Sequence, residues 1–322
     1  MSLIALPLGL GLALASEAPP ISGIIAAVVG GVIVSLLGGS KVTIAGPGNG
    51  LVIVLLAAIG TLGGGDLYQG YLFTLAAIVL SGILMLLLGF LKMGRLANFF
   101  PASAIQGMLA AIGIGILAKQ FHIMVGHNNE TGTIVQLLVA IPNDFLDLLK
   151  TADFNMLFAS AIGLISLLIM VFYSKIRNKY FQLIPAPMWI LILSVGLSYF
   201  YSLLGKQYPM TLDYLVSIPD NVLTDLAFPD FGKIMDKDFI VAVFAITLIA
   251  SIESLLSIKA VDKLDPLMRR SNVNKDLKAL GLATVVSGLL GGLNVVTVIA
   301  RSSVNVNNGA TNKSANFFHA LF

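Results

Sequence analysis

Two polar interruptions and one acidic residue are the places where this sequence could do chemistry. The stretches GGSKVTIAGPGNG, residues 38–50, and GGLNVVTVIARSS, residues 291–303, break apolar segments with glycines, β-branched residues and small polar residues. Non-helical backbone at membrane depth is tolerated only where protein buries it or where it lines a cavity. Glu253 and Arg301 carry charges in apolar surroundings, where a charge is costly and usually functional. The sequence therefore predicts a buried binding site at these breaks.

Each break predicts a short strand followed by a half-helix, with strands over residues 42–45 and 296–300. A helix N-terminus presents free N–H groups and the positive end of the helix dipole, which suits an anion. Gly48 would let a ligand approach the first backbone closely, and Ser302 offers a hydroxyl at the second. Two such breaks in corresponding halves indicate an inverted-repeat transporter with its site near the midplane. An ordinary surface turn at residues 46–50 is the alternative.

The composition indicates an integral membrane protein. The chain has 322 residues, of which 57% are hydrophobic and 11% are charged, and a soluble domain has too little interior for so many apolar side chains. A net charge of +3 is too small to suggest nucleic acid, and the absence of cysteine excludes disulfides and thiolate metal sites. The glycine-rich runs lack the Lys-Ser/Thr of a phosphate-binding loop, so ATP-driven transport is not supported.

Histidines and nucleophiles give no sign of a metal centre or an enzyme. His122, His127 and His319 occupy distant, loop-like or terminal positions, so we expect no metal site. No nucleophile–base pair is visible in the sequence, and we therefore expect no catalytic residues.

Apolar segments of roughly spanning length define the architecture. The amphipathic stretch IVQLLVAIPNDFLDLLK is predicted to lie at the membrane interface. With a cytoplasmic N-terminus, the inner connectors hold 12 Lys and Arg residues and the outer connectors hold 5, as the positive-inside rule requires. The expected segments are 3–15, 21–37, 48–62, 71–91, 102–121, 154–174, 184–204, 239–258 and 276–292, with a further short segment after residue 301 and another span that begins near residue 314.

Five stretches together resemble the sulfate permease family of anion transporters. The resemblance covers nearly the whole chain, in the family's order, and implies a polytopic all-α fold of seven plus seven inverted segments, shared with the proton-coupled uracil transporter. Segments 3 and 10 of that fold contain the short strands and half-helices. The stretches are ALPLGLGLALASEAPPISGIIAAVVGG, GGSKVTIAGP, FFPASAIQGMLAAIGIGILAKQ, IESLLSIKAVDKL and GGLNVVTVIARSSVNVNNGA.

The resemblance also implies which residues bind the anion. Glu253 matches the carboxylate of the eighth segment that the family ties to cation coupling. Relatives often have a polar side chain in the first segment where this sequence has Leu8, which leaves more of the anion contact to backbone and to Arg301. The implied substrate-binding residues come from the third, tenth and first segments: Gly48, Asn49, Ala300, Arg301, Ser302, Leu8 and Leu12.

The domain organisation follows from the resemblance. We expect a core transport domain in residues 1–100, segments 1–4, and in 239–313, segments 8–10. Residues 101–238 would form the gate domain, and residues 314–322 would begin the eleventh segment. The second repeat is incomplete and no STAS domain follows, so the chain is interpreted as a fragment. Members usually form homodimers and work in the cell membrane among its lipids.

These features predict a secondary active transporter of inorganic anions, of the bicarbonate or sulfate class. Coupling to Na⁺ or H⁺ through Glu253 and an elevator-like motion are expected, with no other cofactor. A static pair between Glu253 and Arg301 is the alternative role for these residues. Other functions that stay open are transport of a nucleobase or another small solute on the same fold, an anion channel, and a non-transporting membrane scaffold.

Overall fold

The computed structural model describes residues 2–94, 102–127, 133–151, 154–173, 175–176, 186–205 and 226–322. These residues form helices and a single two-stranded sheet. The helices before residue 210 are α1 (Ser2–Ala15), α2 (Ile21–Leu37), η1 (Asn49–Leu51), α3 (Val52–Gly63), α4 (Leu67–Phe90), α5 (Ala102–Met124), α6 (Ile134–Thr151), α7 (Phe154–Tyr173) and α9 (Ala186–Leu203). Those after it are α10 (Lys237–Asp262), α11 (Val273–Leu289), α12 (Ile299–Asn307) and α13 (Ser314–Leu321).

The predicted apolar segments are helical where the structure describes them, with boundaries that shift by a few residues; residue 174 and residues 184–185 lie outside the described residues. Helices α4, α7, α9 and α10 are long and apolar enough to cross a membrane. The amphipathic stretch forms α6, Ile134–Thr151. Placement of α6 at a membrane interface stays a prediction.

The chain divides into two compact units. One unit comprises Met1–Leu109 and Ile218–Phe322, and the other comprises Ala110–Ser217. The assignment of residues 1–100 and 239–313 to transport and of 101–238 to gating stays a prediction, because a division into units carries no information about movement.

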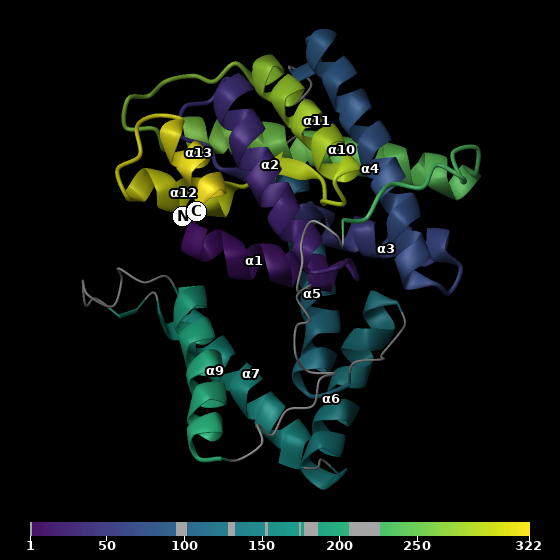
Figure 1. Ribbon diagram of the computed structural model, residues 1–322, viewed down its shortest axis with the longest axis vertical. Coiled ribbons are helices and arrows are strands. Elements are labelled where there is room, and N and C mark those ends of the chain that lie inside the picture. The colour runs from purple at the N-terminus through teal and green to yellow at the C-terminus, as the bar shows by residue number, and fades with distance from the viewer. Residues whose placement is uncertain are drawn as a thin grey trace. The chain divides into compact units, whose positions relative to one another are not determined.

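The core of the first unit lies where α4 packs against α10 and α11. These helices, together with α2, lie side by side in Figure 1. Leu75, Ile78, Ile246 and Leu280 are completely buried there. A Cβ atom on Gly82 would lie 2.8 Å from the carbonyl oxygen of Gly281, so the two glycines let α4 and α11 approach closely. Small residues play this part between membrane helices.

The two breaks meet as strands β1 (Ala45–Pro47) and β2 (Val295–Thr297), which pair antiparallel. The prediction of two short strands is confirmed, and each leads into a half-length helix, α3 or α12. The predicted bounds were wrong: the strands lie at residues 45–47 and 295–297, not at 42–45 and 296–300.

The shift in strand bounds has a physical cause in α12. The N–H of Ile44 donates to Ser302 Oγ at 2.9 Å, and Asn305 Nδ2 donates to the carbonyl oxygen of Val42 at 2.9 Å. Residues 42–44 are therefore held by two polar side chains of α12, together with the backbone bond from the Val298 N–H to the carbonyl oxygen of Ile44. At the other break the helix already begins at Ile299, so the last two residues of the predicted strand belong to α12.

Some backbone groups of the two strands do not pair across the sheet, and side chains of the surrounding helices bind these groups. The N–H of Ala45 donates to Asn316 Oδ1 at 3.1 Å, and that of Thr297 donates to Ser254 Oγ at 3.4 Å. Pro47, opposite Val295, has no N–H, and Thr284 Oγ1 both accepts from the Val295 N–H and donates to its carbonyl oxygen. Helices α10, α11 and α13 thus each contribute one side chain to the sheet.

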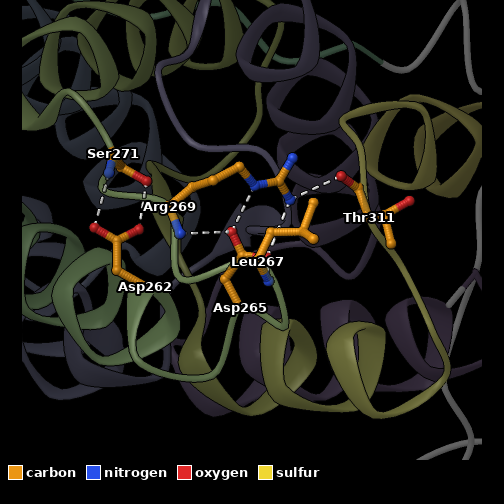
Figure 2. A network of polar contacts seen from close by, with 6 residues as sticks. All are labelled: Asp262, Asp265, Leu267, Arg269, Ser271 and Thr311. Carbon is orange, nitrogen blue, oxygen red and sulfur yellow. Dashed lines mark hydrogen bonds and ion pairs between the residues drawn. The ribbon is translucent and has the colours of Figure 1, made fainter.

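Polar networks fasten the loops at one end of this unit. Figure 2 shows Arg269 between Asp265 and the carbonyl oxygen of Thr311, which ties the loop after α10 to the loop after α12. The Arg269 hydrogen bonds hold the pKa of the Asp265 carboxyl below its ordinary value. Beside Asp265, Asp262 accepts from the hydroxyl and the N–H of Ser271.

A second set of contacts fastens the loop between α2 and β1. Asp276 Oδ1 accepts from the N–H groups of Gly39 at 2.6 Å and Ser40 at 3.0 Å. The Lys313 ammonium donates to the carbonyl oxygen of Gly38. The loop that leads from α2 into the first break is therefore held by α11 and by the loop before α13.

Replacing Thr284 by Val tests the role of side chains in holding β2. The change keeps the shape but leaves the N–H and carbonyl of Val295 without their partner, in a position where Thr284 is completely buried. We expect Thr284→Val to lower the free energy of unfolding by about 1–3 kcal/mol. Thermal or denaturant unfolding in detergent measures the loss.

Thr61→Val is the matched control, because Thr61 is exposed on α3 and bonds only within its own helix. Its free energy of unfolding should change by less than about 0.5 kcal/mol. Equal effects of the two substitutions would contradict the role assigned to Thr284.

Candidate functional site

The starts of α3 and α12 follow the paired strands directly. Gly48 is the N-cap residue of η1, which continues into α3, and Val298 is the N-cap residue of α12. Neither residue makes a side-chain capping bond. Two helix N-termini therefore lie beside one small sheet with their first N–H groups uncapped by their own side chains. This arrangement favours negative charge.

Glu253 lies at the start of the first half-helix. Its side chain comes from α10, the residue is 9% exposed, and Oε1 accepts from the Gly50 N–H at 3.3 Å. Oε2 is buried without a hydrogen-bond partner in the described part of the chain. The carboxylate thus has one backbone donor and an oxygen that is open to a proton or a cation.

Glycines 48 and 50 make room for this carboxylate. A Cβ atom on Gly50 would lie 2.7 Å from Glu253 Oε2, and one on Gly48 would lie 3.0 Å from the same oxygen. The sequence analysis assigned Gly48 to ligand access. The structure adds that Gly48 and Gly50 let the Glu253 side chain reach the backbone of the break.

Arg301 is buried in the first turn of α12. It is 1% exposed, and Nε, Nη1 and Nη2 all lack hydrogen-bond partners among the described residues. Its guanidinium lies against β1, since a Cβ atom on Gly46 would be 2.6 Å from Nη1. A buried charge is costly unless it is paired. Within the described residues Arg301 and Glu253 form no ion pair, so the geometry gives no support to the static pair.

The other predicted residues of the two breaks have different surroundings. Asn49 is partly buried, and its Oδ1 has no hydrogen-bond partner. Ala300 is exposed at the start of α12. Ser302 is fully buried, accepts from the Ile44 N–H and donates to the carbonyl oxygen of Val298 at 2.7 Å. The Ser302 hydroxyl is therefore engaged in holding the break together.

Leu8 and Leu12 lie one turn apart on α1. Leu12 is 8% exposed and Leu8 is partly buried. Helix α1 contacts α3 and β1, which brings this part of the chain to the first break. The two leucines contribute an apolar surface. Their binding role stays a prediction.

Two residues of α13 were missed as parts of this region. Asn316 binds the backbone of β1. His319 is 5% exposed, and neither ring nitrogen has a hydrogen-bond partner within the described ranges. The sequence analysis treated His319 as a terminal residue. A pattern in the sequence could have indicated His319. In the apolar stretch SANFFHALF an asparagine and a histidine are three residues apart, and this spacing puts both on one helix face.

The other two histidines converge on one carboxylate in the second unit. His122 Nδ1 contacts Asp144 Oδ2, and His122 Nε2 bonds the carbonyl oxygen of Leu137 at 2.9 Å. His127 Nδ1 lies 3.8 Å from the same Asp144 oxygen. The interpretation of these histidines as distant was wrong, because α6 carries Asp144 back to both. Within the described ranges no group of three His, Cys, Asp or Glu residues has a metal-binding arrangement.

Paired strands that lead into two half-helices within a helical membrane bundle define the class of inverted-repeat transporter folds. The transmembrane domain of a cyanobacterium bicarbonate transporter, BicA, superposes with a TM-score of 0.82 at 23% identity, covering 99% of this chain and 78% of that one. The murine SLC26A9 anion transporter in its inward-facing state gives a TM-score of 0.79 at 16% identity, covering 99% and 54%. The seven-plus-seven fold is thus confirmed.

Sequence comparison gives the family. A family profile described as the sulfate permease family matches residues 1–322, and the chain belongs to that family. YvdB of Bacillus subtilis is 26% identical over 328 residues, covering 100% of this chain and 57% of the relative. The bicarbonate transporter BicA of Synechocystis is 25% identical over 320 residues, covering 99% and 54%. The chain therefore spans just over half the length of these curated relatives.

Gly50→Ala tests the contact between the first break and Glu253. The added methyl group would overlap the carboxylate and break its bond with the Gly50 N–H, so we expect a loss of about 1–3 kcal/mol in the free energy of unfolding. Thermal unfolding in detergent measures this loss.

Gly60→Ala is the matched control on α3, because a Cβ atom there meets nothing within 4 Å. Alanine is the better helix former, so this variant should gain up to about 1 kcal/mol. If both variants unfold at the same temperature, the close approach at Gly50 is not a constraint.

Proposed function

We propose that the protein is a secondary active transporter of inorganic anions, of the bicarbonate or sulfate class. The observation that carries the proposal is the Arg301 guanidinium, buried without a partner among the described residues and set in the first turn of a half-helix. An anion in its reach would compensate both the side-chain charge and the helix dipole. A neutral solute would leave that charge uncompensated.

The family relationship supports the choice of substrate class. Relatives are named as bicarbonate transporters in two cyanobacteria and as a chloride anion exchanger in mouse. Bicarbonate and sulfate are oxyanions, and the planar fork of an arginine suits two oxygens of one ligand. We propose no catalytic role for any residue of this site.

Glu253 is proposed as the coupling residue. Its carboxylate stands at the start of α3, and its negative charge opposes an anion bound at the adjacent break unless a proton or Na⁺ joins it. The unpartnered Oε2 is an atom that could accept either cation. Joint binding of cation and anion is the physical requirement of symport.

The transport cycle is proposed to follow the elevator type. A core of residues 1–100 and 239–313 would carry the anion past a gate of residues 101–238, within a homodimer in the cell membrane. The network around Asp276, which fastens the first break to α11, supports movement of the two half-helices as one body.

Uptake by the full-length protein in proteoliposomes tests the function. Labelled sulfate and bicarbonate are supplied with and without an inward Na⁺ gradient, and with and without a pH gradient. Uptake of one anion against its own gradient, driven by one of the cation gradients, is expected. Gradient-independent flux would indicate a channel instead.

Replacing Glu253 by Gln separates coupling from anion binding. Glutamine keeps an oxygen that can accept from the Gly50 N–H but removes the charge. We expect Glu253→Gln to retain anion binding and to lose its dependence on pH or Na⁺, measured by equilibrium binding across both variables. Continued accumulation of anion against its gradient by this variant would falsify the coupling role.

Replacing Arg301 by Ala tests the anion site itself. We expect anion binding to weaken by about 2–5 kcal/mol, the scale of a lost buried charge partner. The anion-free protein should be no less stable than the wild type, since an unpaired buried charge has been removed. Lower stability with unchanged binding would show that Arg301 serves the fold and not the ligand.

A further inference from the structure

We propose that His319 of α13 is an anion-contacting residue, and that it donates an N–H to the same oxyanion that Arg301 binds. This inference rests on the proposed function, because it adds a second side chain to that site. It assigns a role to a buried polar residue that nothing else in the described structure uses.

Asn316, three residues before His319 on the same face of α13, indicates which way this face of the helix points. Asn316 binds the N–H of Ala45 in β1, and His319 follows it by three residues, so both side chains project from one side of α13. Arg301 lies against Gly46, the next residue of the same strand. Helices α12 and α13 therefore reach neighbouring residues of one short strand, Arg301 at Gly46 and Asn316 at Ala45, and His319 lies one turn beyond Asn316 on the same face of α13.

Both side chains are buried with their polar atoms unpaired. His319 is 5% exposed and Arg301 is 1% exposed. The two ring nitrogens of His319 and the three guanidinium nitrogens have no hydrogen-bond partner among the residues that the structure describes. Buried polar atoms nearly always have partners, so these five unpaired nitrogens, on two helices that reach the same strand, point to a ligand that binds there.

The donors define the chemistry of that ligand. A guanidinium has five N–H donors and no acceptor, and a neutral imidazole has one N–H donor. The Glu253 carboxylate accepts from Gly50 and forms no ion pair with Arg301. An oxyanion supplies the missing negative charge and several oxygens, so it can accept from the arginine fork and from the imidazole at once.

Two substitutions at His319 distinguish a ligand contact from a packing role. His319→Phe keeps a ring of similar size but has no donor, whereas His319→Gln keeps an N–H donor on a flexible side chain. Binding of sulfate and of bicarbonate to the purified full-length protein is measured by titration calorimetry, and the anion-free melting temperature is measured in parallel. His127→Phe makes the same chemical change in the other unit and serves as the control.

We expect His319→Phe to weaken binding of the transported oxyanion about tenfold or more, the effect of losing a hydrogen bond to a charged group. His319→Gln should stay within about threefold of the wild type, the scale of a hydrogen bond of lower quality. The melting temperature of the anion-free His319→Phe protein should match that of the wild type, and His127→Phe should bind normally.

Unchanged affinity in His319→Phe would overturn the assignment of His319 while leaving the proposed function standing. Equal weakening in both His319 variants, with a lower anion-free melting temperature, would show a structural role and would also overturn it. A wild-type protein that binds neither oxyanion would overturn the proposed function together with this inference.

Discussion

The constraint on which this structure depends is that a short two-stranded sheet inside an apolar helical unit must have all its backbone groups hydrogen-bonded. The β1–β2 ladder satisfies only part of them, because strands of three residues leave the other N–H groups pointing away from the ladder. Thr284, Ser254 and Asn316 bind those groups from three different helices. The sheet therefore fixes the relative positions of α10, α11 and α13 as much as those helices fix the sheet.

The same constraint shapes the site. Helix starts are created where the strands end, so the paired strands lead into two helix N-termini whose own N-cap residues make no side-chain capping bond. The two charges at these starts stay apart: Glu253 binds the backbone of the first break, and Arg301 lies against the second residue of β1. A direct ion pair would cancel both charges. Their separation leaves an acceptor for a cation and a donor for an anion within one unit, which is the arrangement that coupled binding requires.

The loops at one end of the unit make the breaks part of a stiff body. Asp276 and Lys313 hold the segment before β1, and the Asp265–Arg269 contact joins the loops after α10 and α12 (Figure 2). Residues before position 50 and after position 260 are thereby connected at both the sheet and the loops. A ligand held between the half-helices would consequently be held by both halves of the chain together.

The sequence by itself determined the membrane class, the helices, the two breaks and the family, because apolar length and glycine-rich interruptions are local properties of the chain. It also singled out Glu253 and Arg301, since a charge in an apolar segment is conspicuous in any sequence. Only the tertiary structure decided the strand bounds, because Ser302 and Asn305 reach back across more than 250 residues to bind the segment before β1. It likewise decided that Glu253 meets Gly50 and that Asn316 of α13 binds the backbone of β1. Such contacts join residues distant in the chain, and no local pattern specifies which of many compatible partners will meet.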